Sequence, residues 1–213
     1  MKLPITPSKI IGVGRNYREH AKELGNVAPE KEPLLFLKAP SALIFDGDAI
    51  VLPPESSRVD YEGELALVIG RKIKSWPQER WLEALEGVSC ANDVTARDLQ
   101  KTDGQFARAK SFDTFCAVGP GIVSGLDPSD LKIETRVNGA VRQSARTSDM
   151  VFSPAFLVAY ISRMMTLEPG DLILTGTPAG IGALASGDTV EVEIEKIGVL
   201  RNTVAAGDGG HPR

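Results

Sequence analysis

Alternating apolar and polar positions along much of the chain predict β-strands. Between Lys132 and Ser144, two alternating runs flank Asn138-Gly139, a dipeptide that favours a tight hairpin turn. A second strand pair is predicted in TVEVEIEKIGVLRNTV, residues 189–204. Shorter apolar runs predict further strands at LLFLK (34–38), AIVL (49–52), GELALVIG (63–70), VSCAND (88–93) and DLILT (171–175).

A short helix is predicted near the N-terminus. NYREHAKEL, residues 16–24, has helical composition, with Asn16 as the N-cap and Glu19 three residues later as its capping-box partner. Gly25 supplies a stop signal, and the following NVAPEKEP is polar and interrupted by prolines. We therefore expect this helix to lie at the edge of the protein as a mobile flap.

Two further helices are predicted. Residues 78–86 form an acidic and apolar candidate, and Ser153-Pro154 opens a helix through Met165, with serine as the N-cap and proline in the first turn. The expected fold class is therefore mostly β with a few helices (α+β). The 213 residues contain no linker-like segment, so we expect one domain over residues 1–205 and a disordered tail at 206–213.

Charge and hydropathy exclude several kinds of partner. A net charge of −4 with interspersed signs gives no basic stripe for nucleic acid. Apolar runs stay below about 18 residues, and MKLPITPSKI lacks the apolar centre of a signal peptide, so a cytoplasmic protein without a membrane span is expected. Cys90 and Cys116 form no CxxC pair and are interpreted as ordinary reduced thiols.

Two glutamates flank a single glycine where a buried strand is predicted to begin. Side chains alternate along a strand, so Glu62 and Glu64 project together and repel each other. Such a pair implies exposure, a shared proton, a basic partner or a cation. Asp93 ends another short apolar run, and three carboxylates form the hard oxygen set that Mg²⁺ or Mn²⁺ prefers. A solvated strand edge is the alternative interpretation.

His20 and Glu23 lie three residues apart, on one face of the predicted N-terminal helix. The simplest interpretation is an exposed histidine in a polar helix. The functional alternative is a general base, because a neighbouring carboxylate fixes the tautomer of the imidazole and stabilises its protonated form.

Two more segments have a simple and a functional interpretation. Lys110, before Ser111 and Phe112, is either a surface lysine or a fixed charge that stabilises an enolate or alkoxide. TGTPAGIG, residues 175–182, is either an ordinary loop or a binding loop whose hydroxyl and backbone N–H groups hold a carboxylate. It lacks the lysine of a nucleotide phosphate loop.

Taken together, these segments resemble the fumarylacetoacetate hydrolase family, specifically its short members of the acylpyruvase type. The resemblance runs in order across nearly the whole chain. It rests on GRNYREHAKELG (14–25), LFLKAPSALI (35–44), DYEGELALVIG (60–70), NDVTARDLQ (92–100), RAKSFD (108–113) and LTGTPAGIG (174–182).

The resemblance implies a mixed β-roll, usually a homodimer, with one Mg²⁺ or Mn²⁺ per subunit and a helical lid over residues 14–31. The implied roles are listed by class: metal ligands Glu62, Glu64 and Asp93; catalytic residues His20, Glu23 and Lys110; substrate contacts Arg15, Arg97, Gln100 and Thr177.

The implied activity is hydrolysis of a C–C bond in small 2,4-dioxo acids such as acylpyruvates or fumarylpyruvate. His20 and Glu23 would direct water at the distal carbonyl, and Lys110 would share the charge of the departing enolpyruvate. Oxaloacetate decarboxylation passes through the same enolate. Two alternatives stay open: an isomerase of 2-hydroxyhepta-2,4-diene-1,7-dioate, and a binding module that uses the cation structurally.

Overall fold

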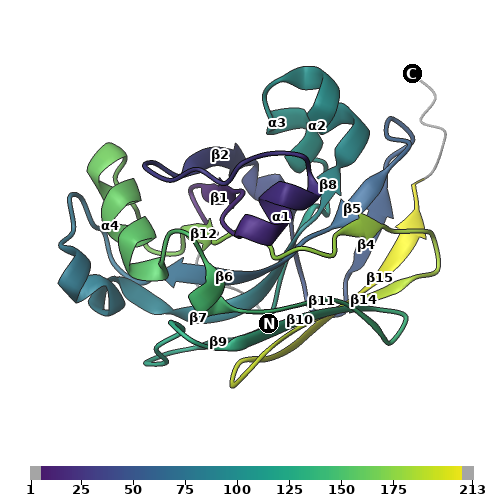
Figure 1. Ribbon diagram of the computed structural model, residues 1–213. Coiled ribbons are helices and arrows are strands. Elements are labelled where there is room, and N and C mark those ends of the chain that lie inside the picture. Colours follow the sequence, from purple (N-terminus) through teal and green to yellow (C-terminus); the bar gives the residue numbers. More distant parts are fainter. Residues whose placement is uncertain (1–5, 208–213) are drawn as a thin grey trace.

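The computed structural model describes residues 6–207 (Figure 1). Its α-helices are α1 (Arg18–Glu23), α2 (Arg97–Asp103), α3 (Ala107–Lys110) and α4 (Pro154–Met164), with short 3₁₀ helices η1 (Pro40–Ala42), η2 (Gln78–Ala84) and η3 (Thr147–Asp149). The strands are β1 (Ile10–Gly14), β2 (Leu34–Lys38), β3 (Leu43–Phe45), β4 (Ala49–Leu52), β5 (Val59–Tyr61), β6 (Gly63–Ile69), β7 (Leu85–Asp93), β8 (Thr95–Ala96), β9 (Cys116–Val123), β10 (Lys132–Val137), β11 (Ala140–Arg146), β12 (Leu172–Leu174), β13 (Gly182–Ala183), β14 (Thr189–Ile194) and β15 (Gly198–Ala206). The predicted fold class, mostly β with a few helices, is confirmed.

The strands of the described residues form three sheets. A seven-stranded sheet has the order β2-β1-β12-β6-β7-β9-β3, a five-stranded sheet the order β11-β10-β14-β15-β4, and a small sheet the order β13-β5-β8. In Figure 1, α4 lies at one end of the molecule, whereas α1, α2 and α3 gather on the opposite side of the large sheet from β10 and β14.

Strand β6 is buried on both faces, which explains its almost continuous apolar sequence. Leu65, Leu67 and Ile69 pack into the core that also contains residues of β10, β14 and α4. Ala66 and Val68 face a second core cluster on the other side. The central strand therefore has no solvent-facing side where a carboxylate could be hydrated.

Most predicted elements are confirmed. The β10–β11 hairpin turns at Asn138 and Gly139, whose φ angles of 52° and 78° are those of a tight left-handed turn. The second predicted pair is β14–β15. Helix α4 begins as expected, because Ser153 Oγ accepts a hydrogen bond from the backbone N–H of Phe156.

Two helix predictions are wrong in detail. Tyr17, not Asn16, precedes α1, and no side chain caps the helix. The Asn16 side chain instead joins distant segments: it donates to the carbonyls of Phe152 and Thr175 and accepts from the Phe152 N–H. The predicted helix at 78–86 is the 3₁₀ helix η2, and β7 already begins at Leu85.

Helices α2 and α3 were not predicted, because their sequence is short and mostly polar. Only Arg97 of α2 is fully buried, so no apolar periodicity marks the helix. Gly104, with a φ of 69°, ends α2 and allows the turn toward α3. This turn leads into α3, which ends at the buried Lys110.

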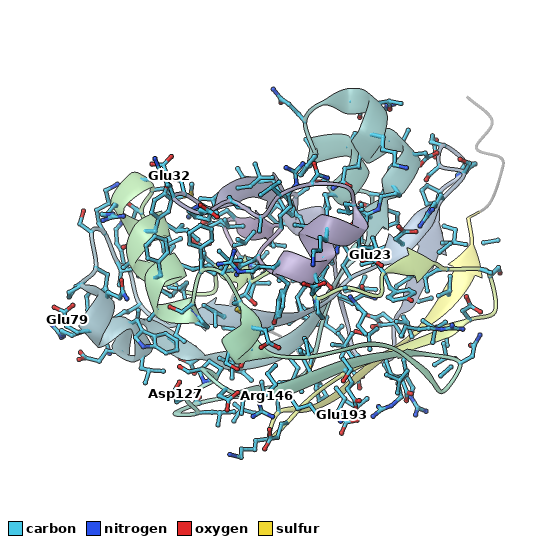
Figure 2. All side chains as sticks on the ribbon, viewed as in Figure 1. Glu23, Glu32, Glu79, Asp127, Arg146 and Glu193 are labelled. Carbon is cyan, nitrogen blue, oxygen red and sulfur yellow. The ribbon has the colours of Figure 1, made fainter. Side chains whose placement is uncertain are left out.

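The predicted disordered tail, 206–213, falls mainly on residues 208–213, outside the described range. Ala206 ends β15, and the N–H of Gly207 bonds to the Leu52 carbonyl at 2.9 Å. Within residues 6–207, no helix is both long and apolar enough to cross a membrane. Charged side chains such as Glu79, Asp127 and Arg146 project from the rim of the fold (Figure 2).

Gly63 provides a test of the fold. A Cβ at this position would lie 2.0 Å from Thr135 Oγ1 of the facing sheet. We expect Gly63→Ala to lower the free energy of unfolding by roughly 1–3 kcal/mol through overpacking, as measured by urea denaturation. Gly121→Ala is the matched control, because nothing lies within 4 Å of its added Cβ.

Adding Thr135→Ala to Gly63→Ala should recover part of the loss, since it removes the clashing hydroxyl. Equal stability of Gly63→Ala and Gly121→Ala would contradict the close approach of the two sheets at this point.

Candidate active site

Three buried carboxylates meet at the ends of β6 and β7. Glu62 and Glu64 project to the same side, as predicted, and Asp93 is the last residue of β7. The backbone pairing sets this meeting, because Gly63 pairs with Asn92 and the Asp93 N–H bonds to the Glu62 carbonyl at 2.8 Å. One oxygen from each carboxylate lies within 4.8 Å of the others. The alternative of a solvated strand edge is therefore wrong.

Basic side chains compensate two of the three carboxylates. Lys110 Nζ donates to Glu62 at 2.7 Å and to Asp93 at 2.5 Å. Arg97 donates to Glu62 and, at 2.9 Å, to the buried Asp60. Lys110 is thus buried, and the interpretation of this lysine as a surface residue is wrong.

Lys38 is a site residue that the sequence analysis missed. Its fully buried Nζ donates to Asp93 Oδ1 at 2.5 Å, so each oxygen of Asp93 accepts from a different lysine. The one local signal is a lysine at the end of the apolar LLFLK strand. That pattern is also typical of a strand that ends at the surface, and it does not reveal a partner 55 positions away.

Glu64 differs from its two neighbours. Among residues 6–207 it forms no ion pair, and its Oε2 accepts only from the Gly176 N–H, at 2.7 Å. Burial and the charges of Asp93 and Glu62 raise the pKa of Glu64 well above its usual value. For Glu62, burial is outweighed by Lys110 and Arg97, which hold its pKa well below the usual range.

A divalent cation fits this arrangement. One oxygen from each of three carboxyl groups converges, and no base bonds to one of them, Glu64. A cation beside Glu64 would relieve the repulsion from Asp93 and Glu62 that raises the pKa of this carboxyl. Carboxylate oxygens suit Mg²⁺ or Mn²⁺, and Glu62, Glu64 and Asp93 are the residues that would hold it.

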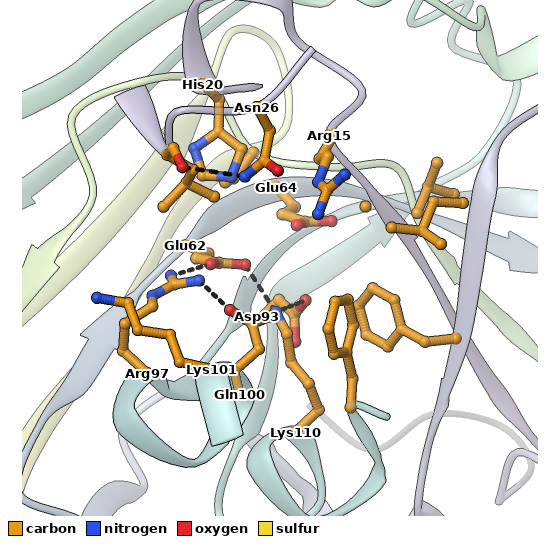
Figure 3. Close-up of a pocket in the computed structure, with 17 residues that line it drawn as sticks. Arg15, His20, Asn26, Glu62, Glu64, Asp93, Arg97, Gln100, Lys101 and Lys110 are labelled. Atoms are coloured by element: carbon orange, nitrogen blue, oxygen red, sulfur yellow. Dashed lines mark hydrogen bonds and ion pairs between the residues drawn. The ribbon is translucent and has the colours of Figure 1, made fainter. Parts of the chain in front are cut away.

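Helix α1 places His20 over the carboxylates, on the opposite side from Lys110 and Arg97 (Figure 3). His20 is only 4% exposed, so the simple interpretation of a solvent-exposed histidine is wrong. Its Nδ1 lies 3.4 Å from Glu23 Oε2, and Glu23 accepts the Gly180 N–H at 3.1 Å. Burial lowers the pKa of His20 despite the opposing charges of Glu62 and Glu23. A neutral imidazole at neutral pH can accept a proton.

The four predicted substrate contacts all line one cavity of about 200 Å³ together with the triad. Three of them already form hydrogen bonds within the protein. Arg97 donates to Gln100 at 2.5 Å, and the Thr177 hydroxyl donates to the Gly63 carbonyl at 2.9 Å. Arg15 has a φ of 58°, a costly backbone conformation for arginine that is often found at functional sites.

Gln143, also absent from the prediction, supports the loop that carries Thr177. Its amide accepts from the Gly63 N–H at 3.0 Å and donates to Thr177 Oγ1 and the Pro178 carbonyl, both at 2.7 Å. The loop of residues 175–182 is therefore joined to β11 and to the start of β6.

One wall of the cavity is apolar. Phe36 and Phe106 form it, with their rings edge to face, and Leu24 and Leu34 also line the cavity. Gly12 makes room for Phe36, because a Cβ there would lie 2.2 Å from the ring. Lys110 Nζ lies 4.9 Å from the Phe36 ring centre. Charges on the floor of the cavity are therefore shielded from water on this side.

The family described as fumarylacetoacetate (FAA) hydrolase C-terminal matches residues 9–205. The chain belongs to the fumarylacetoacetate hydrolase family. Over 213 residues it is 45% identical to the mitochondrial oxaloacetate tautomerase Fahd2a of Rattus norvegicus, a match that covers 94% of this chain and 68% of that protein.

Solved structures of this family agree with the fold. A 5-carboxymethyl-2-hydroxymuconate delta-isomerase from Mycobacterium smegmatis superposes with a TM-score of 0.89 at 50% identity, covering 96% of this chain and 81% of that chain. A 2-hydroxyhepta-2,4-diene-1,7-dioate isomerase from Mycobacterium marinum gives a TM-score of 0.89 at 48% identity, covering 98% and 78%. The chain therefore belongs to a family of enzymes that includes a tautomerase and isomerases.

The raised pKa of Glu64 provides a test of the site. Its pKa in the cation-free folded protein lies well above the ordinary 4.5, so the folded state keeps a proton that the unfolded state releases. This contribution to stability is fully present below about pH 4.5 and is lost as pH rises through the raised pKa of the folded state. We therefore expect Glu64→Gln in EDTA to gain stability relative to wild type as pH rises from about 4.5, measured by urea denaturation.

Saturating Mg²⁺ at the higher pH should reverse the order, because the ionised carboxylate binds the cation more strongly than a neutral amide does. Glu19→Gln is the control, since Glu19 is an exposed glutamate of α1. A stability difference between Glu64→Gln and wild type that does not vary with pH would contradict the raised pKa.

Proposed function

We propose that this protein is a Mg²⁺- or Mn²⁺-dependent enzyme that moves a proton at the carbon beside the carbonyl of a small 2-oxo acid. The first candidate reaction is the keto–enol tautomerisation of oxaloacetate. The observation that carries the proposal is the position of His20, a buried base that lines the same cavity as three convergent carboxylates.

When bound by Glu62, Glu64 and Asp93, the cation would act as a Lewis acid that polarises the 2-oxo carbonyl. His20 would then take a proton from C3, and the C–H electron pair would move into the C2–C3 bond as the carbonyl oxygen becomes an enolate oxygen. Returning the proton to this oxygen completes the enol. Lys110 supplies a fixed positive charge for the developing enolate.

Glu23 would orient the base. By accepting the Nδ1 proton of His20, it leaves the Nε2 lone pair free to accept a proton. Its bonds to the Gly180 N–H hold Glu23 against the loop of residues 175–182. Tautomer and position of the imidazole would then both depend on the contact of α1 with that loop.

The cavity favours a small dianionic substrate. Its volume of about 200 Å³ is below the usual range for drug-sized ligands. Arg15 lines it and forms no ion pair among residues 6–207, and the exposed Lys101 lies at its edge. These cations are suited to the second carboxylate of a diacid such as oxaloacetate, the compound in the name of the rat relative.

Hydrolysis of a C–C bond in acylpyruvates is the second candidate, and the sequence analysis placed it first. Two observations favour it: the dyad of His20 and Glu23 could activate water, and the apolar wall around Phe36 could hold an acyl group. Oxaloacetate decarboxylation passes through the same enolpyruvate, and isomerisation of diene diacids passes through a dienolate of the intact substrate. A homodimer and a cytoplasmic location stay predictions.

A single set of assays separates these reactions. Enol formation from oxaloacetate is followed by ultraviolet absorbance, and pyruvate release is measured with oxaloacetate and acetylpyruvate, each with Mg²⁺, Mn²⁺ or EDTA. We expect fast tautomerisation without stoichiometric pyruvate. Turnover in EDTA, or full activity of Glu64→Ala, would contradict the role of the triad. If none of these substrates is turned over, the result would favour the alternative of a binding module that uses the cation structurally.

His20→Gln should lower kcat for tautomerisation by roughly 10²–10⁴, the usual contribution of a general base. Lys22→Gln is the matched control on the same helix, because its side chain is 75% exposed, and it should change kcat by less than about twofold. Similar activity of the two variants would exclude His20 as the base.

A further inference from the structure

Lys38 has no surface from which to contact a substrate. Its side chain is fully buried, and Lys38 is not among the residues that line the cavity. Its ammonium donates to Asp93 at 2.5 Å and to the Val94 carbonyl at 3.3 Å. Because Lys38 cannot reach a substrate, any effect on the site comes through its bond to Asp93 and through its charge. Burying that charge costs free energy.

Once Glu64 is ionised, the site contains equal numbers of acidic and basic side chains, although no base bonds to Glu64 itself. The four carboxylates are Asp60, Glu62, Glu64 and Asp93; the four bases, which bond to all of these except Glu64, are the buried Lys38, Arg97 and Lys110 and the half-exposed Arg58. A divalent cation therefore brings the ionised site to an excess of two positive charges. A dianionic ligand would restore the balance.

We propose that Lys38 acts through Asp93 and sets the charge of the cation site. This inference rests on the proposed function. It lowers the affinity of the triad for a free divalent cation and raises the affinity of the loaded site for a dianion. The cation and the dianion are then held together more readily than the cation alone.

The two effects have one physical cause. Lys38 Nζ is in direct contact with a candidate ligand, so it repels a cation at the triad and attracts an anion that binds to that cation. Burial strengthens both effects, because little water screens them. Lys110 repels the cation as well, but it lines the cavity, so its loss would also remove a ligand contact.

Opposite changes in two affinities separate this role from a purely structural one. We expect Lys38→Met and Lys38→Gln to bind Mn²⁺ at least about tenfold more tightly than wild type in titration calorimetry without ligand. Oxalate, a dianion, should bind at least about threefold more weakly to each Mn²⁺-loaded variant. Oxamate, a monoanion of similar shape, should lose less affinity than oxalate.

If Lys38 only holds Asp93 in place, both variants should bind Mn²⁺ more weakly, and that result would overturn the proposal. Unchanged affinities would overturn it too. Lys38→Gln keeps an N–H donor for Asp93 and allows the test if the methionine variant does not fold. Lys72→Met is the charge-matched control, because its side chain is 70% exposed and paired with Glu168.

Failure of the Lys38 proposal can be distinguished from failure of the proposed function. If wild type binds Mn²⁺ and turns over oxaloacetate but the Lys38 variants lose affinity for both ligands, only the Lys38 proposal fails. If wild type does not bind Mn²⁺, both proposals fail.

Discussion

The structure depends on the burial of carboxylates at one point between β6 and β7. Burying charged groups costs several kcal/mol each unless they are compensated, so each neighbouring element supplies a compensating group. Lys38 comes from β2, Arg97 from α2, Lys110 from α3 and the Gly176 N–H from the loop after β12. The site therefore joins the ends of otherwise separate parts of the chain.

The remaining architecture keeps this point fixed. Gly63 lets the five-stranded sheet approach through Thr135, and Gln143 ties the start of β6 to the loop that carries Thr177. Asn16 anchors the segment before α1 to two distant carbonyls. The helix that carries His20 is thus attached firmly at its start, whereas the contact of Glu23 with Gly180 is partly exposed.

The cavity combines a charged floor with an apolar wall, and its chemistry depends on both. Phe36 and Phe106 keep water from one side of Lys110, so its charge acts at lower effective dielectric. In the proposed reaction, this charge would stabilise an enolate. The same chemistry of an enolate stabilised by fixed charge underlies tautomerisation, decarboxylation and C–C cleavage. The fold can therefore serve several reactions, and the groups around the substituent of the substrate decide between them.

The sequence by itself determined the features that depend on near neighbours in the chain. Strand alternation placed Glu62 and Glu64 on one side, Asn138-Gly139 specified a hairpin, and Ser153 marked the start of α4. The family motifs brought His20 and Asp93 into the same site. Only the tertiary structure decided which groups balance these charges. Lys38 lies 55 positions from Asp93, Gln143 lies 80 from Gly63, and Asn16 lies 136 from Phe152. Local patterns cannot specify such pairs. The cost of burying a polar group is offset by its hydrogen-bond partner, and that partner comes into reach only when the sheets pack.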